Sequence, residues 1–148
     1  MIFDDKIGSL FEKIASLHIN LSRHARIALE PLGITYPQFG ALLVLSNLGE
    51  MIQKQLSSHL ETDTTNTMVI CIGLEKRKPI TRKQSFEDKC ANIVSITAKG
   101  KELFQESMAV LAGIYGPVAN SITGKEREVA NEILGKLLET LNSFGKES

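Results

Sequence analysis

Residues 49–100 read GEMIQKQLSSHLETDTTNTMVICIGLEKRKPITRKQSFEDKCANIVSITAKG, and this stretch decides the fold. Its first half predicts two short helices, over residues 53–60 and 64–77, with Asp63 as the N-cap of the second. Four residues of the second helix recur at helical spacing and should face the core, namely Thr67, Ile70, Cys71 and Leu74.

A hairpin is expected directly after these helices. Pro79 has no N–H to donate and so prevents the second helix from continuing. Residues 80–84 and 90–96 alternate well enough to form two strands, joined by a loop at 85–89. Two helices followed by a hairpin are typical of a helix-turn-helix with a wing, which binds duplex DNA.

The charge distribution favours the same function. Residues 76–101 hold eight basic and two acidic side chains, a net charge of +6, whereas the rest of the chain has a net charge of −6. A positive patch on an acidic body attracts polyanions to one face. An isolated run of this kind would be a solvated loop surface, but its place on a hairpin favours contact with phosphates.

Long helices are expected on both sides of this module. Residues 5–29 carry an apolar stripe, and a helix after Thr97 should end at Gly116-Pro117. The last helix begins at a capping box and is expected to bury Val129, Ile133, Leu134, Leu137, Leu141 and Phe144. These stripes could fold back within one monomer or pair with a second chain, and we favour the dimer, since a two-fold axis suits a palindromic site.

Composition excludes several classes of protein. The chain has 148 residues, 43% of them hydrophobic and 23% charged, which is typical of one globular domain. No apolar run approaches the roughly 20 residues of a membrane helix, and the N-terminus does not read as a signal peptide. Two cysteines are too few for a disulfide framework and suit the cytoplasm. We find no catalytic set, metal-ligand pair or cofactor motif, so we expect neither an enzyme nor a cofactor.

Five segments of the chain resemble motifs of one family. Residues 32–39, LGITYPQF, are similar to L-G-L-T-x-x-Q-F, and residues 53–60, QKQLSSHL, are similar to Q-x-E-L-A-x-x-L. Residues 74–77, LEKR, match L-E-x-R, and EDK followed by IVSITAKG at 93–100 resembles a wing and its L-V-x-L-T-x-x-G signature. In this order and spacing the motifs resemble the MarR family of winged-helix regulators over nearly the whole chain.

The resemblance implies a mainly α fold, a winged helix-turn-helix with a two-stranded β wing and N- and C-terminal dimerisation helices. It assigns residues 1–34 and 117–148 to dimerisation, 35–100 to the winged helix-turn-helix and 98–116 to a connecting helix. It also implies a homodimeric transcriptional regulator, a repressor that binds a pseudo-palindromic operator and responds to a small ligand, an oxidant or a metal.

The sequence departs from the family at four positions. The recognition helix usually carries basic residues where this chain has Val69 and Gly73. The wing usually has two arginines where this chain has Lys89 and Cys90. Lysine keeps the charge of arginine without its forked geometry, and cysteine keeps neither. These losses leave open a degenerate relative that binds a ligand or a protein but no specific DNA.

The helix over 64–77 is expected to enter the major groove by its first turn. Its backbone N–H groups and the hydroxyls of Thr64 and Thr65 would bind phosphate. Asn66 can pair with adenine, and Met68 or Val69 can touch thymine methyl groups. The alternative for Thr64, Thr65 and Asn66 is ordinary helix capping and solvent exposure. The alternative for Met68, Val69 and Ile72 is burial against a neighbour.

Flanking contacts are expected on both sides of that helix. Gln53 and Lys54 begin the preceding helix and would hold a phosphate. Arg82, Lys83 and Lys89 lie on the hairpin and would add positive charge near the minor groove.

Two further hypotheses concern regulation. His18, with Arg23 or Arg26 as a carboxylate partner, could bind a small aromatic or phenolic effector. Cys90 lies near Lys83 and Lys89, which would lower its pKa, so a thiol-based redox switch is a second alternative function. Cys71 falls at a core position, where inert packing is expected.

Overall fold

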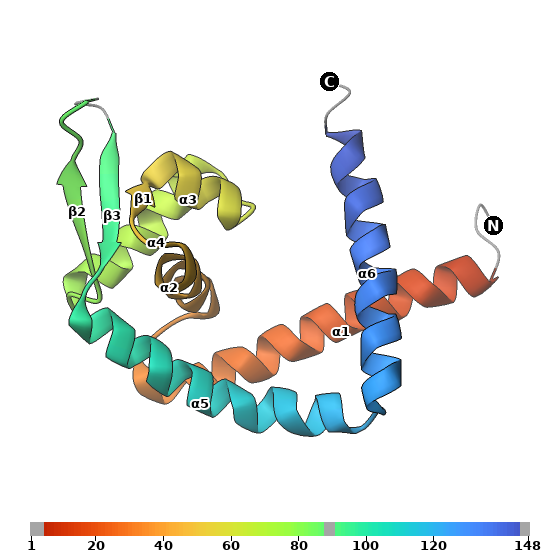
Figure 1. The fold of residues 1–148 in the computed structure, drawn as a ribbon. Helices are drawn as coiled ribbons and strands as arrows, with labels where there is room; N and C mark the ends of the chain where they lie inside the picture. The colour runs from red at the N-terminus through yellow and green to blue at the C-terminus, as the bar shows by residue number, and fades with distance from the viewer. Residues whose placement is uncertain (1–4, 88–90, 146–148) are drawn as a thin grey trace. The chain divides into compact units, whose positions relative to one another are not determined.

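A computed structural model describes residues 5–87 and 91–145, and Figure 1 shows its fold. The chain divides into two compact units, residues 1–111 and 112–148. The elements in chain order are α1 (Asp5–Leu29), the short 3-10 helix η1 (Glu30–Leu32), α2 (Tyr36–Leu48), β1 (Met51–Ile52), α3 (Gln53–His59), α4 (Thr64–Lys76), β2 (Ile80–Gln84), β3 (Asn92–Ile96), α5 (Ala98–Asn120) and α6 (Gly124–Phe144). The predicted mainly α winged-helix fold is confirmed.

Local capping fixes where α2 begins. The backbone N–H of Gln38 donates to Thr35 Oγ1 at 3.2 Å, and the backbone N–H of Thr35 donates to Gln38 Oε1 at 3.0 Å. This is the predicted capping box, which satisfies two helix-end donors at once. Thr123 and Glu126 form the same reciprocal pair at the start of α6, at 2.9 and 3.2 Å.

The sheet has three strands in the order β1-β3-β2, all antiparallel. Ile80 pairs with Ile96 and Gln84 with Asn92, which confirms the predicted hairpin, here called the wing. The third strand, Met51–Ile52 against β3, was not predicted because two residues are too short to show alternation. The sheet is therefore larger than the two-stranded wing expected from the sequence.

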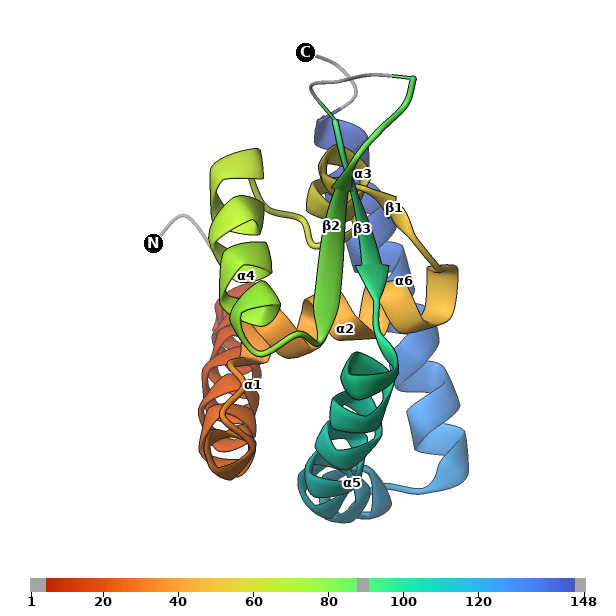
Figure 2. The same ribbon diagram turned by 90° about the vertical axis from the view of Figure 1, so that its left-hand side faces the viewer.

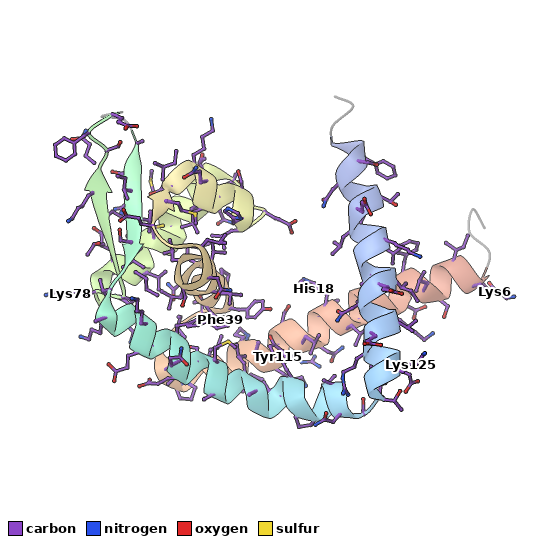
Figure 3. The ribbon with its side chains drawn as sticks, viewed as in Figure 1. Lys6, His18, Phe39, Lys78, Tyr115 and Lys125 are labelled. Carbon is purple, nitrogen blue, oxygen red and sulfur yellow. The ribbon has the colours of Figure 1, made fainter. Side chains whose placement is uncertain are left out.

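The core of the first unit lies where α2, α4 and α5 meet the sheet. The four residues of α4 predicted to face inward are all buried, namely Thr67, Ile70, Cys71 and Leu74. Phe39 of α2 stacks on Phe104 of α5, with ring centroids 5.9 Å apart, and Figure 3 shows Phe39 among the side chains around α2. The aromatic pair packs α5 against α2, and the buried face of α4 packs against α2 and α3.

The predicted end of the fifth helix at Gly116-Pro117 is wrong. Helix α5 continues through Pro117 to Asn120. The proline removes the N–H that would bond to the carbonyl of Gly113, and its ring crowds that carbonyl.

The predicted burial of the last helix is also wrong for the single chain. Helix α6 has no buried residue. Its exposed large apolar side chains are Val129, Ile133, Leu134, Leu138, Leu141 and Phe144. Helix α1 shows the same pattern, with Ile7, Leu10, Phe11, Leu17, Ile19 and Ile27 exposed. Each of these two helices therefore carries an uncovered apolar face.

Within the described residues, no single helix combines the length and the apolar composition needed to span a membrane. The segments Asp5–Leu32 and Tyr36–Leu48 reach the required length and composition only together, across a bend of 81°.

Candidate nucleic-acid interface

Helix α4 starts at a carboxylate cap. Asp63 Oδ1 accepts a hydrogen bond from the backbone N–H of Asn66 at 2.6 Å, and the hydroxyl of Thr67 donates to the Asp63 carbonyl at 2.9 Å. Thr64 and Thr65 are exposed at the tip beside this cap. The negative Asp63 already complements the positive end of the helix, so attraction of a phosphate by the helix dipole is reduced. Recognition here therefore depends on side chains more than on the helix end.

Asn66 is exposed one turn into α4 and is partly restrained. Its Nδ2 donates to the Thr62 hydroxyl at 3.0 Å. A carboxamide NH₂ carries two donors, so one N–H remains for a second acceptor while Oδ1 accepts. This arrangement preserves the donor and acceptor that adenine pairing needs, and it limits how far the amide can rotate.

The outer face of α4 is apolar and uncovered. Val69 is 64% exposed, Met68 46% and Ile72 41%. The alternative of burial against a neighbour is therefore wrong within the single chain. An exposed apolar face on this helix can contact thymine methyl groups but cannot pair with phosphates.

Close packing explains why glycine occupies position 73, where the resemblance leads us to expect a basic residue. A Cβ there would lie 2.4 Å from Gln38 Nε2. That amide belongs to the capping box of α2, so a larger side chain at 73 would displace it. The missing charge therefore accompanies the close packing of α4 on α2.

A crevice of about 260 Å³ brings several of the predicted residues together. Its lining comes from the start of α3, the tip of α4 and the start of β3, namely Ile52, Gln53, Lys54, Thr64, Met68, Ala91 and Asn92. Asn92 was not predicted, because a polar residue at a strand end carries no distinguishing signal in the sequence. With the Lys54 ammonium and the Thr64 hydroxyl, its amide makes the crevice suitable for an anionic oxygen.

Two basic side chains of the wing differ in exposure and in pairing. Figure 2 shows β2 beside α4, with β3 between β2 and β1. Lys83 is exposed, as expected for a phosphate contact. Arg82 instead pairs with Glu75 of α4, with Nε 2.7 Å from Oε2. Lys89 lies outside the described residues.

Comparison with known proteins assigns the chain to a family. The model of the MarR family matches residues 34–89. The organic hydroperoxide resistance transcriptional regulator of Bacillus subtilis (strain 168) is 30% identical over 122 residues, which cover 82% of this chain and 82% of that protein. The chain belongs to the MarR family. It is a winged-helix transcriptional regulator, and that relative is likewise named as a regulator and not as an enzyme.

Solved structures share the MarR family fold. Sco3205, a MarR family transcriptional regulator from Streptomyces coelicolor in complex with DNA, has a TM-score of 0.86 at 16% identity, covering 94% of this chain and 93% of that one. The Mycobacterium tuberculosis MarR family protein Rv2887 in complex with p-aminosalicylic acid has a TM-score of 0.66 at 24% identity, covering 88% and 96%.

Cys71 of this MarR family member lies in surroundings that make its thiol unreactive. Cys71 is fully buried. Burial raises the pKa of its thiol to about 11, with the positive charge of Arg82 opposing the rise and Glu75 adding to it. The thiolate is the reactive species, so the predicted packing role of Cys71 agrees with these surroundings. Cys90, the candidate redox residue, lies outside the described residues.

The expected effector residues are exposed on α1, but His18 and Arg23 do not share one face. His18 and Arg23 are five positions apart, which separates them by about 140° around a helix. Arg23 donates to Asn20 Oδ1 one turn earlier, and Arg26 is exposed near the end of the helix. Helix α1 alone therefore does not bring Arg23 beside His18, whereas Arg26, eight positions after His18, is only about 80° from it around the helix.

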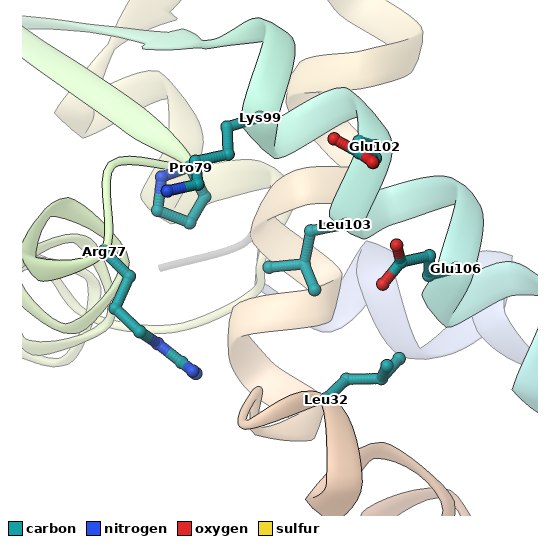
Figure 4. Close-up of a pocket in the computed structure, with 7 residues that line it drawn as sticks. All are labelled: Leu32, Arg77, Pro79, Lys99, Glu102, Leu103 and Glu106. Atoms are coloured by element: carbon teal, nitrogen blue, oxygen red, sulfur yellow. The ribbon is translucent and has the colours of Figure 1, made fainter.

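A separate hollow of about 370 Å³ lies at the start of α5 (Figure 4). It is lined by Leu32, Arg77, Pro79, Lys99, Glu102, Leu103 and Glu106. Arg77 donates to the carbonyl of Gly33, which ties the end of α4 to the turn after η1. The hollow carries charges of both signs and contains none of the predicted effector residues. Within the described ranges, no group of three His, Cys, Asp or Glu side chains could hold a metal.

Proposed function

We propose that this MarR family regulator binds a pseudo-palindromic operator in double-stranded DNA as a homodimer and acts as a repressor. The observation that carries the proposal is the exposed tip and outer face of α4 beside a wing with free positive charge. This is the geometry in which a recognition helix enters the major groove while a wing reaches the adjacent minor groove.

The dimer is proposed from the uncovered apolar faces of α1 and α6. In α6, Leu134 and Leu138 are 46% and 56% exposed, and Leu141 is 59% exposed. Contiguous apolar faces of this length mark an interaction surface, and a second copy supplies a matching one by symmetry. A two-fold pair of α4 helices then requires two operator half-sites about one helical turn apart.

Base recognition is assigned to the α4 face. Asn66 offers a donor and an acceptor to adenine, and Met68 and Val69 offer apolar contact to thymine methyl groups. Lys54, Lys83 and Lys89 supply phosphate contacts, and the hydroxyls of Thr64 and Thr65 add further ones. The half-sites should therefore be rich in A·T pairs.

Modulation by a small aromatic or phenolic acid is part of the proposal, as is a cytoplasmic location. Rv2887 was solved with p-aminosalicylic acid, which makes aromatic acids the first compounds to test. His18, Arg23 and Arg26 are the candidate contacts. Because α1 alone does not bring them together, we propose that a second chain completes the site. Calorimetry with parent and His18→Ala would show equal binding if His18 has no role.

The second candidate function is a dimer that has lost specific DNA binding. Val69 and Gly73 favour it, because neither supplies the charge usual for the recognition helix. A gel shift of the chain's own upstream region at two salt concentrations separates the two, with unrelated DNA of equal length as control. We expect a specific shift that weakens with salt. No shift at low salt would favour the degenerate relative.

A further inference from the structure

Arg82 stands where three elements of the winged helix meet. Its Nε donates to Glu75 Oε2 at 2.7 Å, and its Nη1 donates to Gln53 Oε1 at 3.5 Å. One guanidinium on β2 therefore reaches the last turns of α4 and the first turn of α3. Glu75 and Gln53 are 22 positions apart in the chain, so local sequence does not impose the arrangement.

The surroundings of this pair differ from those of a surface charge. The Arg82 side chain is 21% exposed and that of Glu75 is 41% exposed. Partial burial weakens solvent screening, and the planar guanidinium directs its N–H groups along fixed lines. Neighbouring Lys83 lies on the other side of the strand by alternation and is exposed.

We propose that Arg82 is a positioning residue that fixes the wing against α4, with Glu75 as its counterion, and that it does not contact phosphate. The inference rests on the proposed DNA-binding function and revises the role expected for Arg82 from the sequence. The angle between α4 and the wing determines whether both reach DNA together. Loss of Arg82 therefore weakens binding through geometry, whereas loss of Lys83 weakens it through charge.

Salt dependence separates these two mechanisms. Anisotropy titrations of Arg82→Gln and the matched Lys83→Gln use the upstream DNA at several salt concentrations. Each lost phosphate contact lowers the slope of log K against log salt by about 0.9. We expect that reduction for Lys83→Gln, and for Arg82→Gln a loss of about tenfold at every salt with the parental slope. A slope reduced equally by both variants would overturn the proposal.

A charge exchange tests the pair directly. Glu75→Arg and Arg82→Glu should each weaken DNA binding, and the double variant should recover part of the loss. An arginine that contacted phosphate would give no recovery, because residue 82 would then be acidic.

Melting temperatures of the free protein give a readout independent of DNA. For Glu75→Gln, Arg82→Gln and their double variant, we expect the two losses not to add, since each single change breaks the same pair. Additive losses would overturn the proposal. If the parent binds no DNA even at low salt, the proposed function fails, while the melting cycle still decides whether the pair fixes the wing.

Discussion

Replacing Gly100 with alanine tests how α5 is anchored to the base of the wing. A Cβ at residue 100 would lie 2.0 Å from the carbonyl oxygen of Pro79 and 2.7 Å from Ile96 Cγ1. The nearer obstacle is backbone, which no rotamer change can move. The same carbonyl accepts hydrogen bonds from the backbone N–H of Thr97 at 2.9 Å and from its hydroxyl at 3.0 Å.

These contacts set the size of the effect. Overpacking costs roughly 1–3 kcal/mol, and each weakened hydrogen bond adds roughly 0.5–1.5 kcal/mol. The higher helix propensity of alanine offsets about 1 kcal/mol at most. We therefore expect Gly100→Ala to lower the free energy of unfolding by roughly 2–4 kcal/mol.

Urea denaturation followed by circular dichroism measures this loss, at one fixed protein concentration because a dimer's stability depends on concentration. Gly113→Ala is the matched control in the same helix, since an added Cβ there meets nothing within 4 Å. The control should be up to about 1 kcal/mol more stable than the parent. A Gly100→Ala variant as stable as the parent would refute the close approach to Pro79.

Three further predictions concern the thiol, the α6 cap and the dimer. With Cys90→Ser, the remaining Cys71 should resist alkylation at pH 8, where about one thiol in a thousand is ionised at a pKa of about 11; rapid native labelling would contradict its burial. Thr123→Ala should cost about 1 kcal/mol of stability in urea melts. The capping hydrogen bonds lower the pKa of Glu126 below its usual 4.5. The stability that the Glu126 carboxylate adds should therefore be present above pH 4.5 and disappear as the pH falls through the lowered pKa. If the free energies of unfolding of the parent and Thr123→Ala differ by the same amount at all pH values, this explanation is excluded. Leu141→Glu should yield monomers in light scattering, and an unchanged mass would argue against the α6 interface.

The sequence predicted the features that are set locally. Asp63, Thr35 and Thr123 were identified as caps because the residues that complete each cap lie within three positions. The buried face of α4 followed from helical spacing alone. These signals need no knowledge of the rest of the fold.

The missed features depend on distant parts of the chain. Met51 and Ile52 form a strand only because β3 offers an edge to pair with. The ion pair of Arg82 with Glu75 depends on how β2 returns beside α4, which the sequence does not show. From its place in a basic hairpin, Arg82 was therefore predicted to contact phosphate. Pro117 was expected to end a helix on propensity, yet α5 continues to Asn120, and local propensity alone does not decide where this helix ends.

The uncharged outer face of α4 has a thermodynamic consequence for binding. Contact of Met68, Val69 and Ile72 with thymine methyl groups would remove apolar surface from water, which gives a negative heat-capacity change. The enthalpy of association should then become more favourable on warming. Half-site preference that arises in this way would depend little on ionic strength, whereas the phosphate contacts proposed for Lys54 and Lys83 would still weaken with salt. Temperature would therefore change the discrimination between half-sites, and salt would change the overall affinity.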